Sequence, residues 1–306
     1  MRQSFESNPS VYVVMNPVSG TNEPETVREK IRSTLDERHL SYEIYETTGK
    51  ENLKETIQEA VQAGYRVFLA VGGDGTIAAV ANGLAGTGLP LVIIPNGTWN
   101  GLARNLDIPL RLDQAVDLIF QEHEIREIDA LEVDGQYYLL NVSAGLGSRS
   151  MTNVKREEKR RLGVFYDLRN AIKQLLGFQS FRFEVKVDGK PSRFRASEVV
   201  VANIRSIALK SVQLDPEIRM DDRKMHLCRI YAESARDYFG IALSMITGRQ
   251  QQDWRVRCLD SFQEVEIRCN HRLPVQADGD LIGYLPLRVK LGCSVVRIVT
   301  PVSAQL

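Results

Sequence analysis

Up to about residue 120, the chain alternates between short apolar runs and longer stretches in which apolar residues recur every three or four positions. The short runs are typical of strands and cover residues 10–15, 41–46, 66–71 and 91–95. The longer stretches have the periodicity of helices, with stripes of Val27, Ile31 and Leu35, of Leu53, Ile57 and Val61, and of Ile77, Val80 and Leu84. This alternation predicts a parallel sheet with helices on both faces, and such sheets bind ligands beyond the carboxyl ends of their strands.

Several residues mark where these helices begin and end. Asn22 and Asp113 precede apolar stripes, and we expect each to cap the helix that follows. Gly64 follows the second stripe and is expected to end that helix. A further helical stripe runs from Trp99 to Leu106.

After about Glu127 the pattern changes to strands punctuated by turns, which favours an antiparallel sandwich or barrel. The strand-like segments are 126–133, 137–143, 181–189, 196–203, 224–232, 254–259, 264–269, 273–277 and 286–291. One helix is expected over roughly residues 155–178. The final run, 294–301, is rich in β-branched residues and could return to either domain.

We therefore predict two domains. The first is an α/β domain over residues 1–128, to which 292–306 return. The second is a β-rich domain over 129–291. The two are expected to share an interface with a cleft.

Composition excludes several classes of protein. The 306 residues include 39 Lys and Arg against 39 Asp and Glu, so global charge indicates no polyanionic partner. No basic-aromatic stretch suggests nucleic-acid binding. No apolar run is long enough to span a bilayer, and the first ten residues lack the apolar core of a signal peptide. The four cysteines lack CxxC spacing, so we expect reduced thiols rather than a disulfide or metal cluster, and a cytoplasmic protein.

The stretch VGGDGTIAAVANGL, residues 71–84, follows the third predicted strand. Gly73, Gly75 and Ala78 fit the dinucleotide fingerprint GxGxxA, but Asp74 would repel a pyrophosphate and no acidic residue ends the next strand. A P-loop is absent, because no GxxxxGK[ST] occurs. An acid among phosphates makes sense where Mg²⁺ lies between them, or where it orients a hydroxyl near a γ-phosphate. The loop therefore favours a triphosphate, with a simple helix cap at Asp74 as the alternative.

Three more polar loops follow predicted strands and would lie at the same edge of the sheet. They are NPVSG at 16–20, TTG at 47–49, and PNGTWNGLARNLDIP at 95–109. One such loop is commonplace, but four in succession indicate a binding site.

At these residues the chain resembles the diacylglycerol kinase catalytic-domain family, which includes bacterial soluble lipid kinases and sphingosine kinases. MNPVSG, VGGDGTIAAVANGL and PNGTWNGLARNLDIP match its nucleotide motifs in order, and YLLNVSAGLG, KRRLG and VQADGDLIGYLP match its second domain. A lone GGDGT is less specific, since NAD kinases carry one too. The resemblance implies a three-layer α/β nucleotide-binding domain with a parallel sheet, then an antiparallel β-sandwich-like lipid domain, with the active site in the cleft between them.

The resemblance also implies roles for particular residues. The ATP site would comprise Asn16, Ser19, Gly20, Thr47, Gly72, Gly73, Asp74, Gly75, Thr76, Asn82 and Thr98. Asp280 takes the place of the family's catalytic acid, usually a glutamate, and would accept the proton of the lipid hydroxyl. Asp74 and Mg²⁺ would order the phosphates. A metal-binding loop would use the Asp222 carboxylate with backbone carbonyls of Arg219 and Lys224. Asp278-Gly279-Asp280 could alternatively be only a hairpin turn.

The chain departs from the family pattern at several positions. Gly101 stands where the family often has Asp, Arg223 where it has Gly in the metal loop, and Ser148-Arg149 where it tends to carry an Asp facing substrate. Arg149 would disfavour a cationic lipid such as sphingosine. The segment ANIRSIALK lacks the glycines that family members often show.

These observations predict an ATP- and Mg²⁺-dependent lipid kinase that phosphorylates the hydroxyl of diacylglycerol or a related lipid. The alternatives are a kinase of a soluble hydroxyl compound, similar to NAD kinase, and a catalytically silent lipid- or nucleotide-binding protein. Lipid access would be peripheral, at the inner face of the membrane. Basic residues at 155–161 beside the apolar stripe of Leu168, Ile172, Leu175 and Leu176 could supply it, or this stripe could pack on the sheet. The oligomeric state is left open, including a homodimer.

Overall fold

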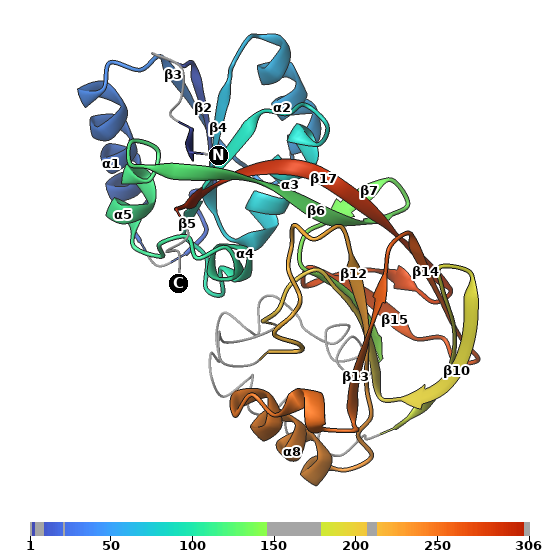
Figure 1. The fold of residues 1–306 in the computed structure, drawn as a ribbon. Coiled ribbons are helices and arrows are strands. Elements are labelled where there is room, and N and C mark those ends of the chain that lie inside the picture. The colour runs from blue at the N-terminus through green and yellow to red at the C-terminus, as the bar shows by residue number, and fades with distance from the viewer. Residues whose placement is uncertain (1, 4–8, 21, 146–178, 207–212, 303–306) are drawn as a thin grey trace. The chain divides into compact units, whose positions relative to one another are not determined.

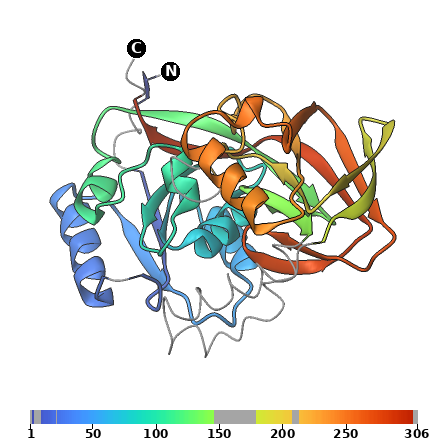
Figure 2. The same cartoon turned by 90° about the horizontal axis from the view of Figure 1, so that it is seen from below.

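The computed structural model describes residues 2–3, 9–20, 22–145, 179–206 and 213–302. The chain divides into two compact units. The first contains residues 1–129 and 293–306, and the second contains residues 130–292. Two long strands, β6 (His123–Val133) and β17 (Leu287–Pro301), pair with each other and contribute to both units (Figures 1 and 2).

The first unit is built on four parallel strands in the order β5-β4-β2-β3. Their bounds are Val11–Met15 for β2, Tyr42–Glu46 for β3, Val67–Gly72 for β4 and Pro90–Pro95 for β5. β2 and β4 are buried along their whole length, as continuous apolar runs in parallel sheets require. The end of β17 adds a fifth parallel strand beside β5, with Arg297 opposite Pro90.

Helices cover both faces of this sheet (Figure 1). α1 (Pro24–Glu37) packs with α5 (Leu112–Asp117) on one face, and α2 (Leu53–Gln62) packs with α3 (Asp74–Leu84) on the other. A short helix, α4 (Gly101–Asn105), follows β5. The unit thus has the predicted three layers around a parallel sheet.

The two predicted helix caps are wrong, whereas the helix end at Gly64 is correct. α1 begins after Glu23, and Asn22 instead donates from Nδ2 to Asn96 Oδ1 at 2.8 Å. Asp113 lies inside the first turn of α5, and no side chain caps that helix. Gly64 follows the last residues of α2 with φ of 97°, a left-handed conformation that ends helices.

The second unit contains two antiparallel arrays packed around an apolar core. One array joins β10 (Lys190–Ala196), β9 (Phe181–Val187), β14 (Glu264–Cys269) and the beginning of β17. The other has the order β13-β12-β11-β8-β15-β16. These strands span Val256–Ser261, Met225–Ile230, Glu198–Ala202, Asn141–Gly145, Pro274–Ala277 and Asp280–Tyr284. Phe183, Val199 and Val289 belong to the core between the arrays, which confirms the predicted sandwich-like class.

Sequence patterns missed three elements of this unit. β10 and β16 complete hairpins with β9 and β15, and α8 (Ala235–Ile246) covers part of the β11–β13 face. β7 (Gln136–Tyr138) and the 3₁₀ turn η1 (Gln250–Gln252) are minor elements of this unit, and β1 (Arg2–Gln3) is a minor element of the first. The helix expected over 155–178 lies outside the described residues.

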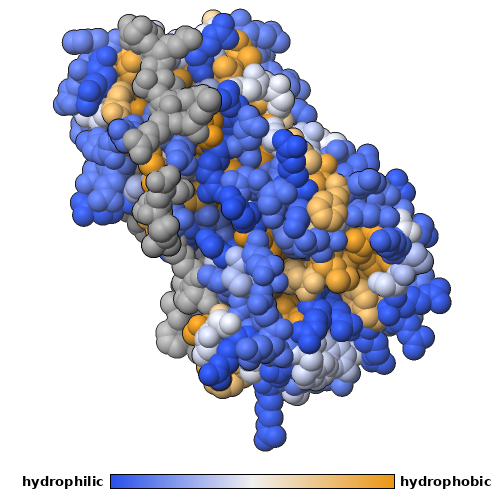
Figure 3. Space-filling view, in the orientation of Figure 1, coloured by the Kyte–Doolittle hydropathy of each residue, from blue (hydrophilic) through white to orange (hydrophobic). Residues whose placement is uncertain are grey.

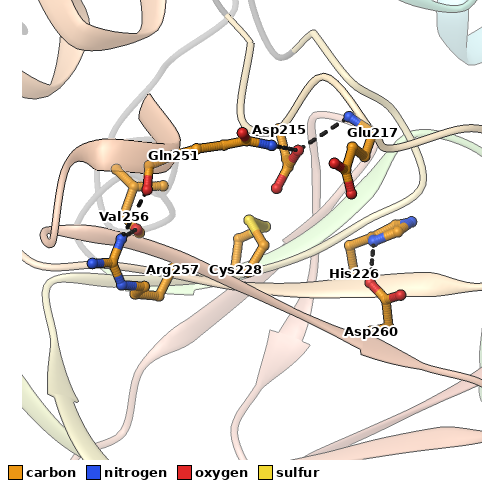
Figure 4. Close-up of a disulfide and its surroundings, with 9 residues drawn as sticks. Asp215, Glu217, His226, Cys228, Gln251, Val256, Arg257 and Asp260 are labelled. Atoms are coloured by element: carbon orange, nitrogen blue, oxygen red, sulfur yellow. Dashed lines mark hydrogen bonds and ion pairs between the residues drawn. A yellow bond between two sulfur atoms is a disulfide. The ribbon is translucent and has the colours of Figure 1, made fainter. Parts of the chain in front are cut away.

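One cysteine pair contradicts the expectation of reduced thiols. Cys228 and Cys258 are directly opposite each other on β12 and β13 and form a disulfide (Figure 4). Their 30-residue separation gave no signal, because cross-strand register decides which cysteines meet. Cys269 and Cys293 are not part of a disulfide. Among the described residues, no helix is both long and apolar enough to cross a membrane.

Contact between α2 and α3 predicts the effect of a small substitution. A Cβ at Gly83 would lie 2.5 Å from Ile57 Cβ, so Gly83→Ala should lower the free energy of unfolding by about 1–3 kcal/mol. At Gly75, also in α3, a Cβ would meet nothing within 4 Å. Gly75→Ala should therefore leave stability unchanged or raise it by about 0.5 kcal/mol. Urea titrations of both variants measure this, and equal effects would contradict the packing described.

Candidate functional site

The loops after the parallel strands of the first unit are tied together by backbone hydrogen bonds. Asn16, just after β2, donates its N–H to Val71 O at 2.9 Å, and Thr47, after β3, donates to Met15 O at 2.9 Å. Asn96, after β5, donates to Gly72 O at 2.8 Å. The loop starts therefore form one row at the carboxyl edge of the sheet, where parallel sheets bind ligands.

Side-chain bonds then join the first loop to its neighbours. Asn16 donates from Nδ2 to Thr76 Oγ1 at 3.1 Å, and Asn96 donates from Nδ2 to Ser19 O at 2.8 Å. Gly20 has φ of 83°, and a Cβ there would lie 1.7 Å from Asn96 O. Only glycine fits that position, because both the backbone angle and the space exclude a side chain.

At the start of α3, the backbone of the glycine loop, Gly72 to Gly75, comes close to the backbone of Gly97. A Cβ on Gly97 would lie 2.6 Å from Gly73 Cα, and a Cβ on Gly72 would lie 2.9 Å from the Thr76 side chain. No side chain caps α3, whose N-cap residue is Gly73. The first N–H groups of a helix lack intrahelical partners and attract anions. Glycines at this helix start leave the backbone free of side chains, as close approach of a phosphate requires.

Asp74 does not cap its own helix, so the alternative interpretation of this residue is wrong. Its carboxylate accepts hydrogen bonds from the N–H groups of Gly101 at 3.0 Å and Leu102 at 3.1 Å. These are the first residues of α4, so the aspartate caps a neighbouring helix from outside. Each carboxylate oxygen can accept a further hydrogen bond or bind a cation.

The turn before α4 depends on residues that sequence reasoning missed. Asn100 has φ of 52° and exchanges two hydrogen bonds with Gly97, at 2.8 and 2.9 Å. A Cβ at Gly101 would lie 2.4 Å from the Trp99 ring. The glycine at position 101, where the family often has Asp, therefore leaves the space that the Trp99 ring occupies. The signal available in the sequence was the Asn-Gly pair, since asparagine tolerates left-handed backbone better than most residues.

The remaining predicted nucleotide residues differ in setting. Thr47 is buried, but the N–H groups of Thr48 and Gly49 are bonded to the Glu51 carboxylate at 2.9 and 3.3 Å. Thr98 is exposed in the loop that follows β5. Asn82 donates to Ala78 O within α3, about 12 Å along the helix axis from Asp74. Asn82 thus lies away from the start of α3.

In the second unit, Asp278-Gly279-Asp280 forms a hairpin, as the alternative interpretation proposed. Asp278 and Gly279 have φ of 49° and 96°, and Ala277 pairs with Asp280 across the turn. The Asp280 side chain is exposed at the start of β16. A hairpin turn does not exclude catalysis, because it holds one exposed carboxylate at a fixed position.

Asp278 anchors this hairpin to the segment between β7 and β8. Its carboxylate accepts three backbone hydrogen bonds, from Leu139 at 2.7 Å, Leu140 at 2.9 Å and Asn141 at 3.0 Å. Burial raises the pKa of the Tyr138 hydroxyl, and the charges of Asp278 and Asp280 raise it further. Asp278 thus determines where Asp280 lies.

In the predicted metal loop, the side chains of Arg219, Asp222 and Lys224 contact other groups of the protein. Asp222 Oδ1 accepts the Lys224 N–H at 3.0 Å, and Asp222 Oδ2 lies 3.5 Å from His226 Nε2. The Lys224 ammonium pairs with Asp260, and the Arg219 guanidinium pairs with Asp221. Within the described residues, no group of three or more His, Cys, Asp and Glu could hold a metal ion. The predicted site is of a different kind, with one carboxylate and two backbone carbonyls, and it stays a prediction. Protein partners therefore occupy the side chains of this loop.

Comparison with known proteins agrees with this architecture. The family described as diacylglycerol kinase catalytic domain matches residues 10–133, and the YegS C-terminal NAD kinase beta sandwich-like domain matches residues 140–300. A diacylglycerol kinase of Bacillus subtilis is 24% identical over 278 residues, 90% of each chain. A crystal structure described as a diacylglycerol kinase of Bacillus anthracis superposes with a TM-score of 0.77 at 21% identity, covering 97% of this chain and 98% of that one.

The two matched domains together span most of the chain, and the second alone spans more than half of it. The protein belongs to the diacylglycerol kinase catalytic-domain family, with the YegS-type second domain. Family membership supports a phosphotransferase of the lipid-kinase type. The matching solved structure shows that the fold is shared.

The two aspartates of the hairpin should contribute unequally to the stability of the fold. Asp278→Ala should lower the free energy of unfolding by about 2–4 kcal/mol, because three backbone N–H groups lose a charged acceptor. Asp280→Ala should change it by no more than about 0.5 kcal/mol, because that side chain is exposed. Chemical denaturation followed by circular dichroism distinguishes them. A larger loss for the Asp280 variant would contradict the anchoring role of Asp278.

Proposed function

We propose that this protein transfers the γ-phosphate of ATP to the hydroxyl of diacylglycerol or a related lipid. The observation that carries the proposal is the start of α3, which no side chain caps and which lies where Gly73 and Gly97 nearly touch. Such a helix start binds phosphate oxygens through backbone N–H groups. Family membership then selects a kinase over other nucleotide-binding proteins.

Within this proposal, the residues of the nucleotide site have different roles. The backbone N–H groups of Gly73 to Thr76 bind the phosphates, and Asn16 positions the Thr76 hydroxyl beside them. Asp74 holds α4 and the Gly97–Asn100 turn against the glycine loop. Ser19, Gly20, Thr47 and Thr98 line the approach to this edge of the sheet.

Mg²⁺ is proposed to enter with the nucleotide. This cation is usually held by one or two carboxylates together with substrate phosphates rather than by an all-protein cage. Asp74 fits that need, because each of its oxygens accepts one backbone hydrogen bond and retains a lone pair. Bound Mg²⁺ would neutralise charge on the phosphate oxygens.

Asp280 is proposed to accept the proton of the lipid hydroxyl as its oxygen attacks the γ-phosphate. An ionised aspartate is about as basic as the glutamate that the family usually carries, although its reach is shorter. The three hydrogen bonds to Asp278 hold the hairpin and so limit the positions that Asp280 can adopt. A base fixed in this way contributes by orientation as well as by proton transfer.

The lipid substrate implies contact with a membrane surface, which we propose to be peripheral and on the cytoplasmic side. Arg149 and the basic stretch 155–161 lie outside the described residues. The preference for a neutral or anionic lipid over a cationic one thus stays a prediction from the sequence.

The proposal predicts transfer of label from γ-labelled ATP to an organic-soluble product in mixed micelles with Mg²⁺. Asp280→Asn should reduce the rate by at least about a hundredfold, because general-base catalysis commonly contributes that much. Asp134→Asn is the matched control, since Asp134 is an exposed aspartate of another Asp-Gly turn in the same unit. Transfer to NAD but to no lipid would instead support the soluble-substrate alternative.

A second prediction separates binding from chemistry. Gly97→Ala should weaken binding of a non-hydrolysable ATP analogue at least tenfold, because the new Cβ would force the Gly73 backbone away. Asp280→Asn should leave that affinity unchanged. Isothermal titration calorimetry of the two variants measures both. Loss of affinity in the Asp280 variant, with none in the Gly97 variant, would contradict the assignment of the nucleotide site.

A further inference from the structure

Helix α8 carries apolar side chains on two different faces. Ile241 and Met245 are buried against β11, β12 and β13. Phe239, Leu243 and Ile246 form a second stripe, which we call the α8 stripe, and their exposed fractions are 73%, 51% and 55%. Figure 3 shows that hydrophobic residues reach the visible surface only in limited areas among hydrophilic ones. A single exposed apolar residue is ordinary, but three at helical spacing form a contact surface.

Polar contacts fix the direction in which this stripe points. Ser234 caps α8 by accepting the Asp237 N–H at 3.3 Å and donating to Asp237 Oδ2 at 2.8 Å. Arg255 then joins Asp237 to Asp253. Gly240 leaves room for this arginine, because a Cβ there would lie 2.7 Å from Arg255 Nη2. The helix therefore cannot rotate to bury the α8 stripe without breaking these bonds.

Basic residues lie at both ends of helix α8. Arg236 lies in the first turn of α8 and Arg249 just beyond its last turn, and both are exposed. Within the described residues, neither guanidinium forms an ion pair. The acidic residues nearest in sequence, Asp237 and Asp253, are committed to Arg255. Trp254, close to Arg249 in sequence, is 61% exposed and packs against Tyr231 with ring centroids 5.6 Å apart and ring planes tilted by 43°.

We infer that the α8 stripe is a membrane-contact surface that binds anionic lipid bilayers. An apolar helix face flanked by arginines matches the boundary between acyl chains and phosphate headgroups. Exposed tryptophan is characteristic of that boundary. Twelve residues are too few to span a bilayer, so the helix would lie in the plane of the surface. The inference rests on the proposed lipid kinase activity, which requires access to a substrate that stays in the membrane.

Co-sedimentation with vesicles, without ATP, tests this surface. The wild-type protein should bind phosphatidylcholine vesicles that contain phosphatidylglycerol. Leu243→Ser should weaken binding about fivefold, and adding Phe239→Ser should weaken it at least tenfold in all, because less apolar surface is buried. Leu259→Ser is the matched control, since Leu259 is 55% exposed on β13 and should have no effect. Charge reversal at Arg236 and Arg249 should abolish the preference for anionic vesicles.

Several outcomes would overturn the inference. They are an absence of wild-type binding, unchanged binding in the double variant, and an equal loss in the Leu259 control. A change from dimer to monomer in the α8 variants, measured by sedimentation velocity, would also overturn it by assigning the stripe to a second copy of the chain. Circular dichroism checks that the variants fold.

Phosphate transfer in detergent mixed micelles separates this surface from the proposed activity. Transfer by the wild type together with unchanged vesicle binding in the double variant would refute the surface alone. An absence of transfer together with stripe-dependent vesicle binding would refute the kinase and retain the membrane contact.

Discussion

One carboxylate holds together the part of the first unit on which nucleotide binding would depend. Asp74 starts α3, yet its two oxygens bind the first N–H groups of α4 at 3.0 and 3.1 Å. Hydrogen bonds to an ionised acceptor are worth about 1.5–3 kcal/mol each. They fix the turn that carries Gly97 and Asn100, and so hold the Gly97 backbone against Gly73. The glycines permit this approach, and the aspartate enforces it.

The second unit uses carboxylates in the same way. Asp278 binds three backbone N–H groups and sets the position of the exposed Asp280. Asp188, in another Asp-Gly turn, accepts N–H groups from Phe262, Gln263 and Glu264. Asp188 and Asp278 both have left-handed backbone, and each organises a neighbouring loop. An aspartate in a conspicuous motif can thus have a structural task, while the residue beside it remains available for chemistry.

The architecture followed from the sequence because periodicity of 3.6 or 2 residues reflects burial directly. The clustering of polar loops followed as well, because the carboxyl ends of parallel strands must share one edge. Contacts set by register and side-chain direction did not follow. The Cys228–Cys258 bond depends on cross-strand register, and the bond from Asn22 to Asn96 joins residues 74 positions apart. The exposed face of α8 was missed because its two apolar faces obscure the helical pattern.

Amide hydrogen exchange with a non-hydrolysable ATP analogue and Mg²⁺ tests the central claim most directly. The account predicts slower exchange at the start of α3, Gly73 to Thr76, and in the 97–102 segment that Asp74 holds. Exchange in the outer strands β9 and β10 should stay unchanged. Saturating nucleotide that leaves residues 73–76 and 97–102 unprotected would contradict the account, because the phosphates would then bind elsewhere.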